Sequence, residues 1–183
     1  TITALAKGGQ YEQAQALLDE MRKAGVPPNV VSYSAAISAC EKGGAWESAL
    51  SLVRGMQAAG VAPNVVSYSA AISACGSAGE WAHALALLDA MQAAGVAPNE
   101  VAFNSAITAC AKGAQWQRAL GLLSRMHGAG IAPSAVSYNA AMAACRSGGA
   151  WERALDLLQE MREAGVAPTL LSYTAAITAC DKN

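Results

Sequence analysis

Hydrophobic and small residues recur along this chain with the spacing of an α-helix. Between residues 30 and 43, Tyr33, Ala36, Ile37 and Cys40 follow an i, i+3, i+4, i+7 pattern. This spacing places their side chains on one face of a helix, while the residues between them face outwards. The pattern therefore predicts a short amphipathic helix at the start of this segment.

Polar residues and glycines mark the two ends of this predicted helix. Asn29 or Ser32 can cap its first turn by accepting bonds from free backbone N–H groups. Lys42 suits the C-terminal end, where unpaired carbonyl groups carry partial negative charge. Gly43 and Gly44 end the helix, because glycine enters the left-handed conformation that closes a helix.

A second apolar stripe follows directly and predicts a second helix. Its members at helical spacing are Trp46, Ala49, Leu50, Val53 and Met56. Gly60 ends this helix, and Pro63-Asn64 turns the chain into the next segment. No segment alternates like a strand, so the sequence predicts helix, tight turn, helix and loop.

The whole pattern repeats every 35 residues. The same interval separates Cys40, Cys75, Cys110, Cys145 and Cys180, and it separates Trp46, Trp81, Trp116 and Trp151. A fixed period of this size predicts a solenoid, in which each unit packs mainly against its neighbours. The complete units are residues 30–64, 65–99, 100–134 and 135–169, all within a single all-α solenoid spanning residues 1–183.

The two ends of the chain hold incomplete units. Residues 1–29 contain the back part of a unit, including its second helix, and residues 170–183 contain a first helix alone. Neither end has the polar outer face of a capping repeat. We therefore expect the sequence to be part of a longer chain.

Composition and charge narrow the function. The chain has a formal net charge of −1 and a pI of about 6.1. This balance argues against wholesale electrostatic binding of nucleic acid, whose affinity comes largely from Lys and Arg neutralising phosphates. Any nucleic-acid contact must therefore depend on a local row of basic residues.

The five cysteines do not predict disulfides. Equivalent residues of stacked helical units lie roughly 8–10 Å apart, whereas a disulfide needs Cα atoms within about 7 Å. We expect small buried thiols in a reducing compartment.

Other chemistry is not supported by the residues. The uncharged stretch from Gly55 to Gly79 is broken by Gly60, Pro63 and Asn64, so we predict no membrane span. There is no Cys-x-x-Cys spacing for zinc and no phosphate-cradling glycine loop. His83 and His127 lie on different second helices, as surface or packing residues. We expect no enzyme activity, no cofactor, no metal and no small-molecule substrate.

The repeated unit resembles the pentatricopeptide repeat. The residues that carry the resemblance in the first complete unit are Val31, Tyr33, Ala49, Met56, Gly60 and Pro63. The resemblance extends over essentially the whole chain, and the related 34-residue tetratricopeptide repeat fits less well. It implies a right-handed α-solenoid that binds single-stranded RNA along its concave face, one base per unit.

The resemblance also implies which residues read the bases. In this family, the fifth residue and the last residue of a unit choose the base. The pairs carried over are Ser34 with Asn64, Ser69 with Asn99, Asn104 with Ser134, and Asn139 with Thr169; Thr174 begins a fifth pair. By resemblance, Ser/Asn prefers adenine, Asn/Ser prefers cytosine, and Asn/Thr is a weaker reader of pyrimidines. The alternative is that these short polar residues are ordinary helix caps and turn residues.

Two further sets of residues follow from the resemblance. The aliphatic second residues, which wedge between bases, are Val31, Val66, Val101, Val136 and Leu171. The basic residues near the ends of the first helices, which contact phosphate, are Lys7, Lys42, Lys112, Arg146 and Lys182. The alternative for these basic residues is simple complementarity to the helix dipole.

Two functions remain open from the sequence. The first is sequence-selective binding of single-stranded RNA, with the resemblance implying a role in RNA processing, stability or translation in the chloroplast or mitochondrion. The second is an architectural role, in which the neutral, alanine-rich solenoid binds protein subunits of a large organellar assembly such as a ribosome or photosystem.

Overall fold

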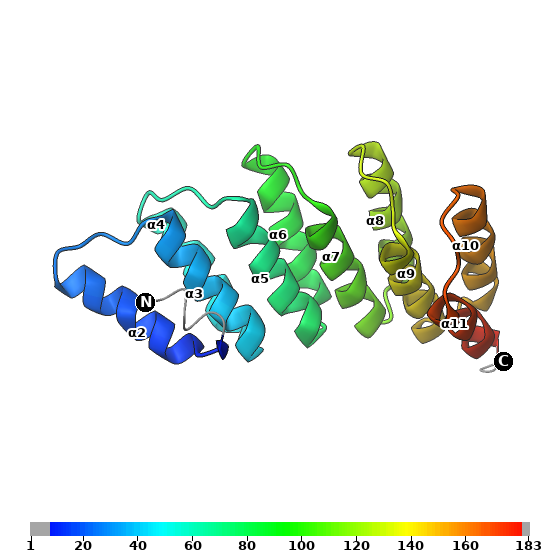
Figure 1. Ribbon diagram of the computed structural model, residues 1–183, viewed down its shortest axis with the longest axis horizontal. Helices are drawn as coiled ribbons and strands as arrows, with labels where there is room; N and C mark the ends of the chain where they lie inside the picture. The colour runs from blue at the N-terminus through cyan, green and yellow to red at the C-terminus, as the bar shows by residue number, and fades with distance from the viewer. Residues whose placement is uncertain (1–7, 181–183) are drawn as a thin grey trace.

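The computed structural model describes residues 8–180, which fold into ten α-helices and no strand (Figure 1). The helices alternate along the chain between two rows. The first helices of the units are α3 (Val30–Gly43), α5 (Val65–Ala78), α7 (Glu100–Lys112), α9 (Ala135–Ser147) and α11 (Leu170–Cys180). The second helices are α2 (Tyr11–Lys23), α4 (Trp46–Ala58), α6 (Trp81–Ala93), α8 (Trp116–Gly128) and α10 (Trp151–Glu163). The all-α, helix–turn–helix prediction is confirmed.

The ends of the first helices follow local chemistry. The Asn29 side chain accepts bonds from the backbone N–H groups of Val31 and Ser32, both at 3.0 Å, and so caps α3. At the other end, Gly44 adopts a left-handed φ of 72°, as expected for glycine after a helix. The equivalent residue after α7 is Ala114, which has a φ of 55°. Alanine is strained in this conformation because its Cβ approaches the following carbonyl.

The core is one continuous strip of small and medium side chains. Tyr33, Ala36, Ile37 and Cys40 are all fully buried, as their helical spacing predicts. The equivalent residues of the next three units are also buried. In α4 the predicted stripe is correct for Ala49, Val53 and Met56. Leu50 is only half-buried, and Leu52 is buried although the predicted stripe omitted it.

The two rows of helices pack differently. Each first helix contacts the first helices beside it, as well as the second helices before and after it. Within residues 8–180, no two second helices bring their backbones into contact. The first-helix row is therefore the more compact one, and we call it the concave layer, because a stack whose units pack closer together on one side curves towards that side. Figure 1 shows the helices stacked in order, with α2 and α11 at opposite ends of the stack.

Small residues permit this close packing of first helices. A Cβ atom added at Gly76 in α5 would overlap the backbone carbonyl of Ser105 in α7. Close by, the Ser73 and Ser105 hydroxyl oxygens lie 2.8 Å apart across the same two helices. The alanine, serine and glycine content of the first helices thus sets the short distance between neighbouring units.

Tryptophans fill the junctions between neighbouring units. A Cβ atom at Gly113 would overlap the ring of Trp81, and one at Gly148 would overlap the ring of Trp116. The equivalent residue in the preceding unit is Ala78, and there the ring of Trp46 lies 5.1 Å from that of His83. Glycine is therefore required at the two later junctions by close approach, and not by backbone conformation.

The cysteines lie in the core, with one exception. Cys40, Cys75, Cys110 and Cys145 are buried and free, and burial raises the pKa of each thiol to about 11. These thiols are protonated and poorly reactive at neutral pH. The prediction of burial is wrong for Cys180, which is exposed. In the described stack only α9 and α10 pack against α11, so one side of this helix remains uncovered.

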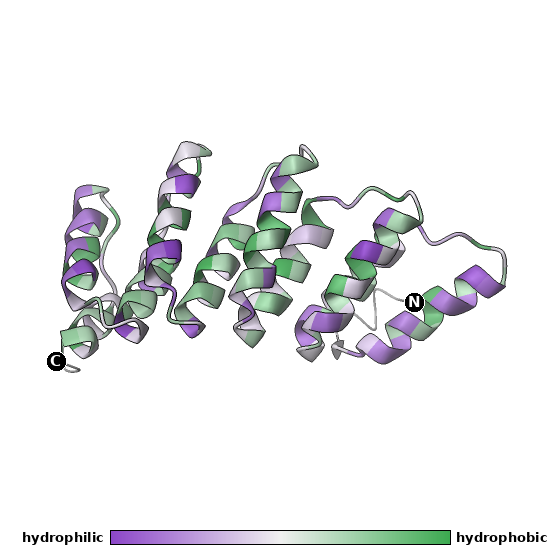
Figure 2. Cartoon of the chain, turned by 180° about the vertical axis from the view of Figure 1, so that it is seen from behind, coloured by the Kyte–Doolittle hydropathy of each residue, from purple (hydrophilic) through white to green (hydrophobic). Residues whose placement is uncertain are grey.

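Hydrophobic character varies along the stack. Figure 2 shows α5 and α6, in the middle, as mainly hydrophobic, whereas α2 and α10 carry many hydrophilic residues. Each of the helices in the described part of the chain is too short or too polar to cross a membrane.

Candidate nucleic-acid interface

In the first two pairs, the fifth and last residues of a unit lie in direct contact. Ser34 Oγ lies 3.5 Å from Asn64 Oδ1, and Ser69 Oγ donates to Asn99 Oδ1 at 3.1 Å. Each asparagine also caps the next helix. Asn64 Oδ1 accepts from the backbone N–H of Ser67 at 3.0 Å, and Asn99 Oδ1 accepts from that of Ala102 at 2.9 Å. Capping and pairing therefore use the same oxygen atom.

The last two pairs, Asn104 with Ser134 and Asn139 with Thr169, also form polar clusters. In these pairs the asparagine is the fifth residue and the hydroxyl residue is the last one. Asn139 Nδ2 donates to Thr169 Oγ1 at 3.2 Å. Asn104 and Ser134 are joined through Ser137, whose Oγ donates to Asn104 Oδ1 at 2.7 Å and lies 3.4 Å from Ser134 Oγ. Thr174 differs from the other fifth residues, because its hydroxyl donates to the Leu170 carbonyl of its own helix at 2.8 Å.

Capping leaves the nitrogen of the amide available. A backbone N–H can only donate, so the atom of Asn64 or Asn99 that it meets must be the carbonyl oxygen. The amide NH2 of each residue then points away from the cap. The side chains can thus be helix caps and base readers at once, because Oδ1 caps the helix while Nδ2 can donate to an acceptor on a base edge.

The sequence did not indicate a role for the third residue of a unit, which lies beside the polar pair that ends the preceding unit. Ser67, Ser137 and Ser172 are fully buried, and each bonds to the pair beside it. The repeated serine at this place was visible in the sequence, but a serine inside a predicted helix gave no signal of a contact with the preceding unit. Its burial depends on how neighbouring first helices stack.

The predicted wedge residues form an exposed aliphatic row. Their side chains remain accessible although they are large and apolar: Val31 64%, Val66 51%, Val101 53%, Val136 61% and Leu171 69% exposed. Each lies in the first turn of its helix, next to a polar pair. A regular row of accessible aliphatic side chains on the concave layer offers apolar surfaces to flat ligands.

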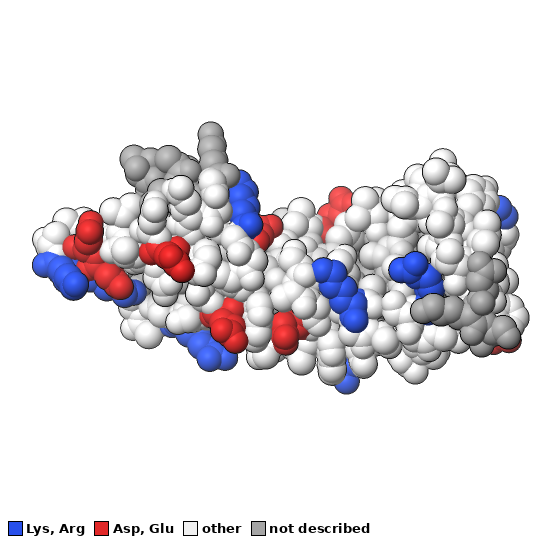
Figure 3. Space-filling view, turned by 90° about the horizontal axis from the view of Figure 1, so that it is seen from below, with Lys and Arg blue, Asp and Glu red and all other residues white. Residues whose placement is uncertain are grey.

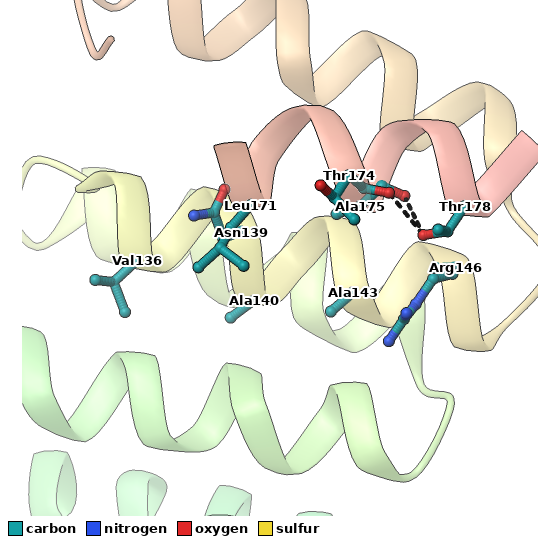
Figure 4. A pocket seen from close by; sticks show the side chains of 9 residues that line it. All are labelled: Val136, Asn139, Ala140, Ala143, Arg146, Leu171, Thr174, Ala175 and Thr178. Carbon is teal, nitrogen blue, oxygen red and sulfur yellow. Dashed lines mark hydrogen bonds between the residues drawn. The ribbon is translucent and has the colours of Figure 1, made fainter. Parts of the chain in front are cut away.

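Two pockets of similar size form between successive wedge residues. One, of about 390 Å³, lies between α9 and α11 and is lined by Val136, Leu171, Asn139 and Arg146. Figure 4 shows Arg146 at the far end of α9 from Val136. The other, of about 370 Å³, is lined by Val101, Val136 and Asn104 among others. Each pocket thus places a fifth-residue asparagine between two aliphatic side chains of neighbouring units.

The predicted phosphate-contacting residues do not form a uniform basic row. Lys7 and Lys182 lie outside the described residues. Lys42 is exposed, and Arg146 lines the first pocket. Lys112 instead donates to the backbone carbonyl of Ser77 in the preceding unit at 2.5 Å. On the face seen in Figure 3, charged side chains of both signs are separated by wide neutral areas.

Two acidic residues face the same region, and one of them, Glu100, accepts from Asn104 Nδ2 at 3.3 Å. Glu41, near the end of α3, lines the second pocket together with Ser73 and Ser77. Burial raises the pKa of the Glu41 carboxyl above its ordinary value, while a hydrogen bond from Ser73 and the charge of Lys42 act in the opposite direction. In the equivalent place the last complete unit carries Arg146, so this position is acidic in the first complete unit and basic in the last.

Residues 8–180 hold no group of three or more His, Cys, Asp or Glu side chains that could bind a metal ion. The chemistry of the concave layer consists of short hydroxyl and amide groups, aliphatic wedges and a few charges. Such groups can recognise a flat polar ligand by hydrogen bonding and apolar contact.

The fold and the repeated polar pairs define a helical-repeat protein with one candidate binding element per unit. The sequence model described as the pentacotripeptide-repeat region of PRORP matches residues 2–125 and 68–183. The chain therefore belongs to the pentatricopeptide-repeat family. The search of curated proteins gave no match.

Solved structures give the same fold. The pentatricopeptide repeat protein PPR10 from maize, in complex with an 18-nt psaJ RNA element, is 31% identical with a TM-score of 0.79. The match covers 98% of this chain and 26% of PPR10, so this chain spans about a quarter of that protein. The PPR domain of Arabidopsis thaliana protein-only RNase P 1, in complex with tRNA, is 15% identical with a TM-score of 0.82. The match covers 98% of this chain and 95% of that domain.

Proposed function

We propose that the chain binds single-stranded RNA along its concave first-helix layer, one base per unit. The observation that carries this proposal is the pair of pockets, each with an asparagine between two aliphatic side chains of successive units. A base inserted there has its faces against Val101 and Val136, or against Val136 and Leu171. Its edge faces the amide of Asn104 or Asn139. The RNA complex of maize PPR10 supports the choice of ligand.

The order of the pairs gives a preferred sequence. By family resemblance, Ser34/Asn64 and Ser69/Asn99 select adenine, Asn104/Ser134 selects cytosine, and Asn139/Thr169 selects a pyrimidine. The proposed core is therefore adenine-adenine-cytosine-pyrimidine in unit order. Family resemblance also supports a role in RNA processing, stability or translation in the chloroplast or mitochondrion.

The test is a binding titration of the full chain with fluorescent RNA oligonucleotides. We expect tighter binding to the adenine-adenine-cytosine-pyrimidine core than to an RNA with every purine and pyrimidine exchanged. Each wrong base should cost about 1–3 kcal/mol. Equal affinity for the two RNAs, or no binding to either, contradicts the proposal.

A matched pair of substitutions tests where the RNA lies. Val136→Ser should weaken binding of every RNA, because Val136 lines both pockets and is 61% exposed, so folding does not depend on it. Leu155→Ser is the control, since Leu155 is an exposed leucine on α10 in the other layer. Equal effects of the two substitutions would exclude the concave layer as the binding surface.

A second candidate function is an architectural one, with protein bound to the solenoid in place of RNA. One observation favours it: Lys112 is held by the Ser77 carbonyl and Glu41 lies in the groove, so little free positive charge faces this layer. The test is purification after nuclease treatment. A stoichiometric protein partner retained by the chain, with no RNA affinity, supports this candidate, and a monodisperse chain without a partner rejects it.

A further inference from the structure

We propose that the buried serine at the third position of the following unit is a positioning residue for base reading, and that only the pairs with a fifth-residue asparagine need it. The inference rests on the proposed function. It extends the reading element from two residues to three, the third being supplied by the neighbouring unit.

The serine connects a fixed backbone donor to the reading amide in the last two pairs. The backbone N–H of Ser134 donates to Ser137 Oγ at 3.1 Å, and Ser137 Oγ donates to Asn104 Oδ1 at 2.7 Å. In the next pair, the Thr169 N–H donates to Ser172 Oγ at 2.9 Å, and Ser172 Oγ donates to Asn139 Oδ1 at 2.6 Å. Both serines are fully buried, so these bonds face no competition from water.

These bonds favour one orientation of the amide. A backbone N–H must donate, so the serine oxygen accepts from it, and the single hydrogen of the serine is free to donate to the amide oxygen. The asparagine atom that receives this hydrogen must be Oδ1. In this orientation the NH2 group is directed away from the serine: that of Asn104 donates to Glu100 Oε1 at 3.3 Å, and that of Asn139 donates to Thr169 Oγ1 at 3.2 Å.

The first two pairs reach the same result without the hydroxyl group. Their asparagine is the last residue of the unit, so a backbone N–H contacts its Oδ1 directly, from Ser67 at 3.0 Å or from Ala102 at 2.9 Å. The second pair has alanine at the third position and still keeps its geometry. Ser67 is present in the first pair, but the orientation of Asn64 does not depend on its hydroxyl group.

The same substitution at equivalent places should therefore have different effects. In Ser137→Ala, the Asn104 amide loses its buried donor and keeps only the 3.3 Å bond to the exposed Glu100 carboxylate, where water competes, so it can present either its oxygen or its nitrogen to the base. Discrimination between cytosine and the other bases at that single position should fall by about tenfold. Discrimination at the other three positions should remain. Ser172→Ala should act likewise at the fourth position, and Ser67→Ala should leave discrimination at the first position unchanged.

The measurement is the affinity of the full chain and the three variants for RNAs that differ at one position at a time. Circular dichroism and thermal unfolding of each variant show whether it folds; if Ser137→Ala does not, Ser172→Ala decides. A uniform loss of affinity for all bases marks a purely structural serine and overturns the inference. Equal effects of Ser67→Ala and Ser137→Ala also overturn it. If the wild-type chain itself shows no base preference, the proposed function is wrong. This result can be told apart from a failure of the serine proposal alone, in which the wild-type chain still prefers its own bases.

Discussion

The first two complete units and the last two build similar polar clusters from opposite arrangements of the same residues. In units 30–64 and 65–99 the amide lies at the end of the unit, where it caps the next helix, and the hydroxyl lies inside the first helix. In units 100–134 and 135–169 the amide lies inside the helix and the hydroxyl lies at the cap. The amide oxygen is bound from the following unit in all four. The position of the asparagine in its unit therefore decides which group of the next unit binds its amide oxygen. An asparagine at the end of a unit is bound by a backbone N–H, and one inside the first helix is bound by a serine hydroxyl.

The largest effect should come from exchanging the two arrangements in one pair. The double substitution Ser34→Asn with Asn64→Ser gives the first pair the order of the third, and Ser67 already supplies the hydroxyl that a fifth-residue amide needs. We expect the base preference at that position to move from adenine to cytosine, with a change of about 10- to 100-fold in the affinity ratio. RNA-binding titrations with single-base variants measure it.

The second pair provides the control for this exchange. Ser69→Asn with Asn99→Ser should switch the preference less well, because Ala102 has no hydroxyl group, and adding Ala102→Ser should restore the switch. If the two exchanges behave alike without Ala102→Ser, the difference between the two halves has no functional meaning.

A large effect on stability should come from the junctions between units. Gly148→Ala places a Cβ atom against the Trp116 ring, and overpacking of this kind should lower the free energy of unfolding by about 1–3 kcal/mol. Gly121→Ala is the matched control. It adds a Cβ within α8 where no atom lies within 4 Å, so it should raise the stability by about 0.5–1 kcal/mol. Urea denaturation of both variants should show opposite signs.

A smaller effect than that of Gly148→Ala should follow from relieving the strained turn after α7. Ala114→Gly replaces an alanine with a φ of 55°, so we expect the protein to become about 1 kcal/mol more stable. The reverse change in the first half, Gly44→Ala, should cost a similar amount, because Gly44 has a φ of 72° and open space around it. A loss of stability in Ala114→Gly would contradict this account of the turn.

The smallest effect concerns Glu41, the acidic residue that lines the pocket between Val101 and Val136. The pKa of Glu41 is raised in the folded protein, so the folded state holds this proton more tightly than the unfolded state. The contribution of Glu41 to stability is therefore fully present below the ordinary value of 4.5. It is lost as pH rises through the higher folded pKa. Glu41→Gln should remove this part of the pH dependence, as measured by denaturation from acidic to neutral pH. The control, Glu47→Gln on the exposed face of α4, should retain it.

The sequence predicted the fold well because helical spacing and period are local properties. The spacing of Tyr33, Ala36, Ile37 and Cys40 alone identifies a buried helix face, and the 35-residue interval shows how often it recurs. The pairs follow from the family resemblance, which assigns base reading to the fifth and last residues of a unit, and not from spacing alone. What could not be found is the geometry between units.

Three features depend on that geometry. The amide oxygen of Asn104 accepts from the buried hydroxyl of Ser137, which lies 33 residues away. Lys112 contacts a carbonyl of the preceding unit, at Ser77, although its place in the sequence suggested phosphate or its own helix end. Cys180 shares its spacing with four buried cysteines, and only the stacking of α11 shows that it is exposed.

The unequal packing of the two rows gives the solenoid a mechanical character. Successive first helices are held together by direct contacts, whereas the second helices α4, α6, α8 and α10 meet only first helices through their backbones. Bending or stretching the stack should therefore open the outer row and leave the inner spacing nearly constant, like a strip hinged along one edge. The distance between consecutive pockets along the first-helix row should then stay nearly constant while the second helices move apart or together.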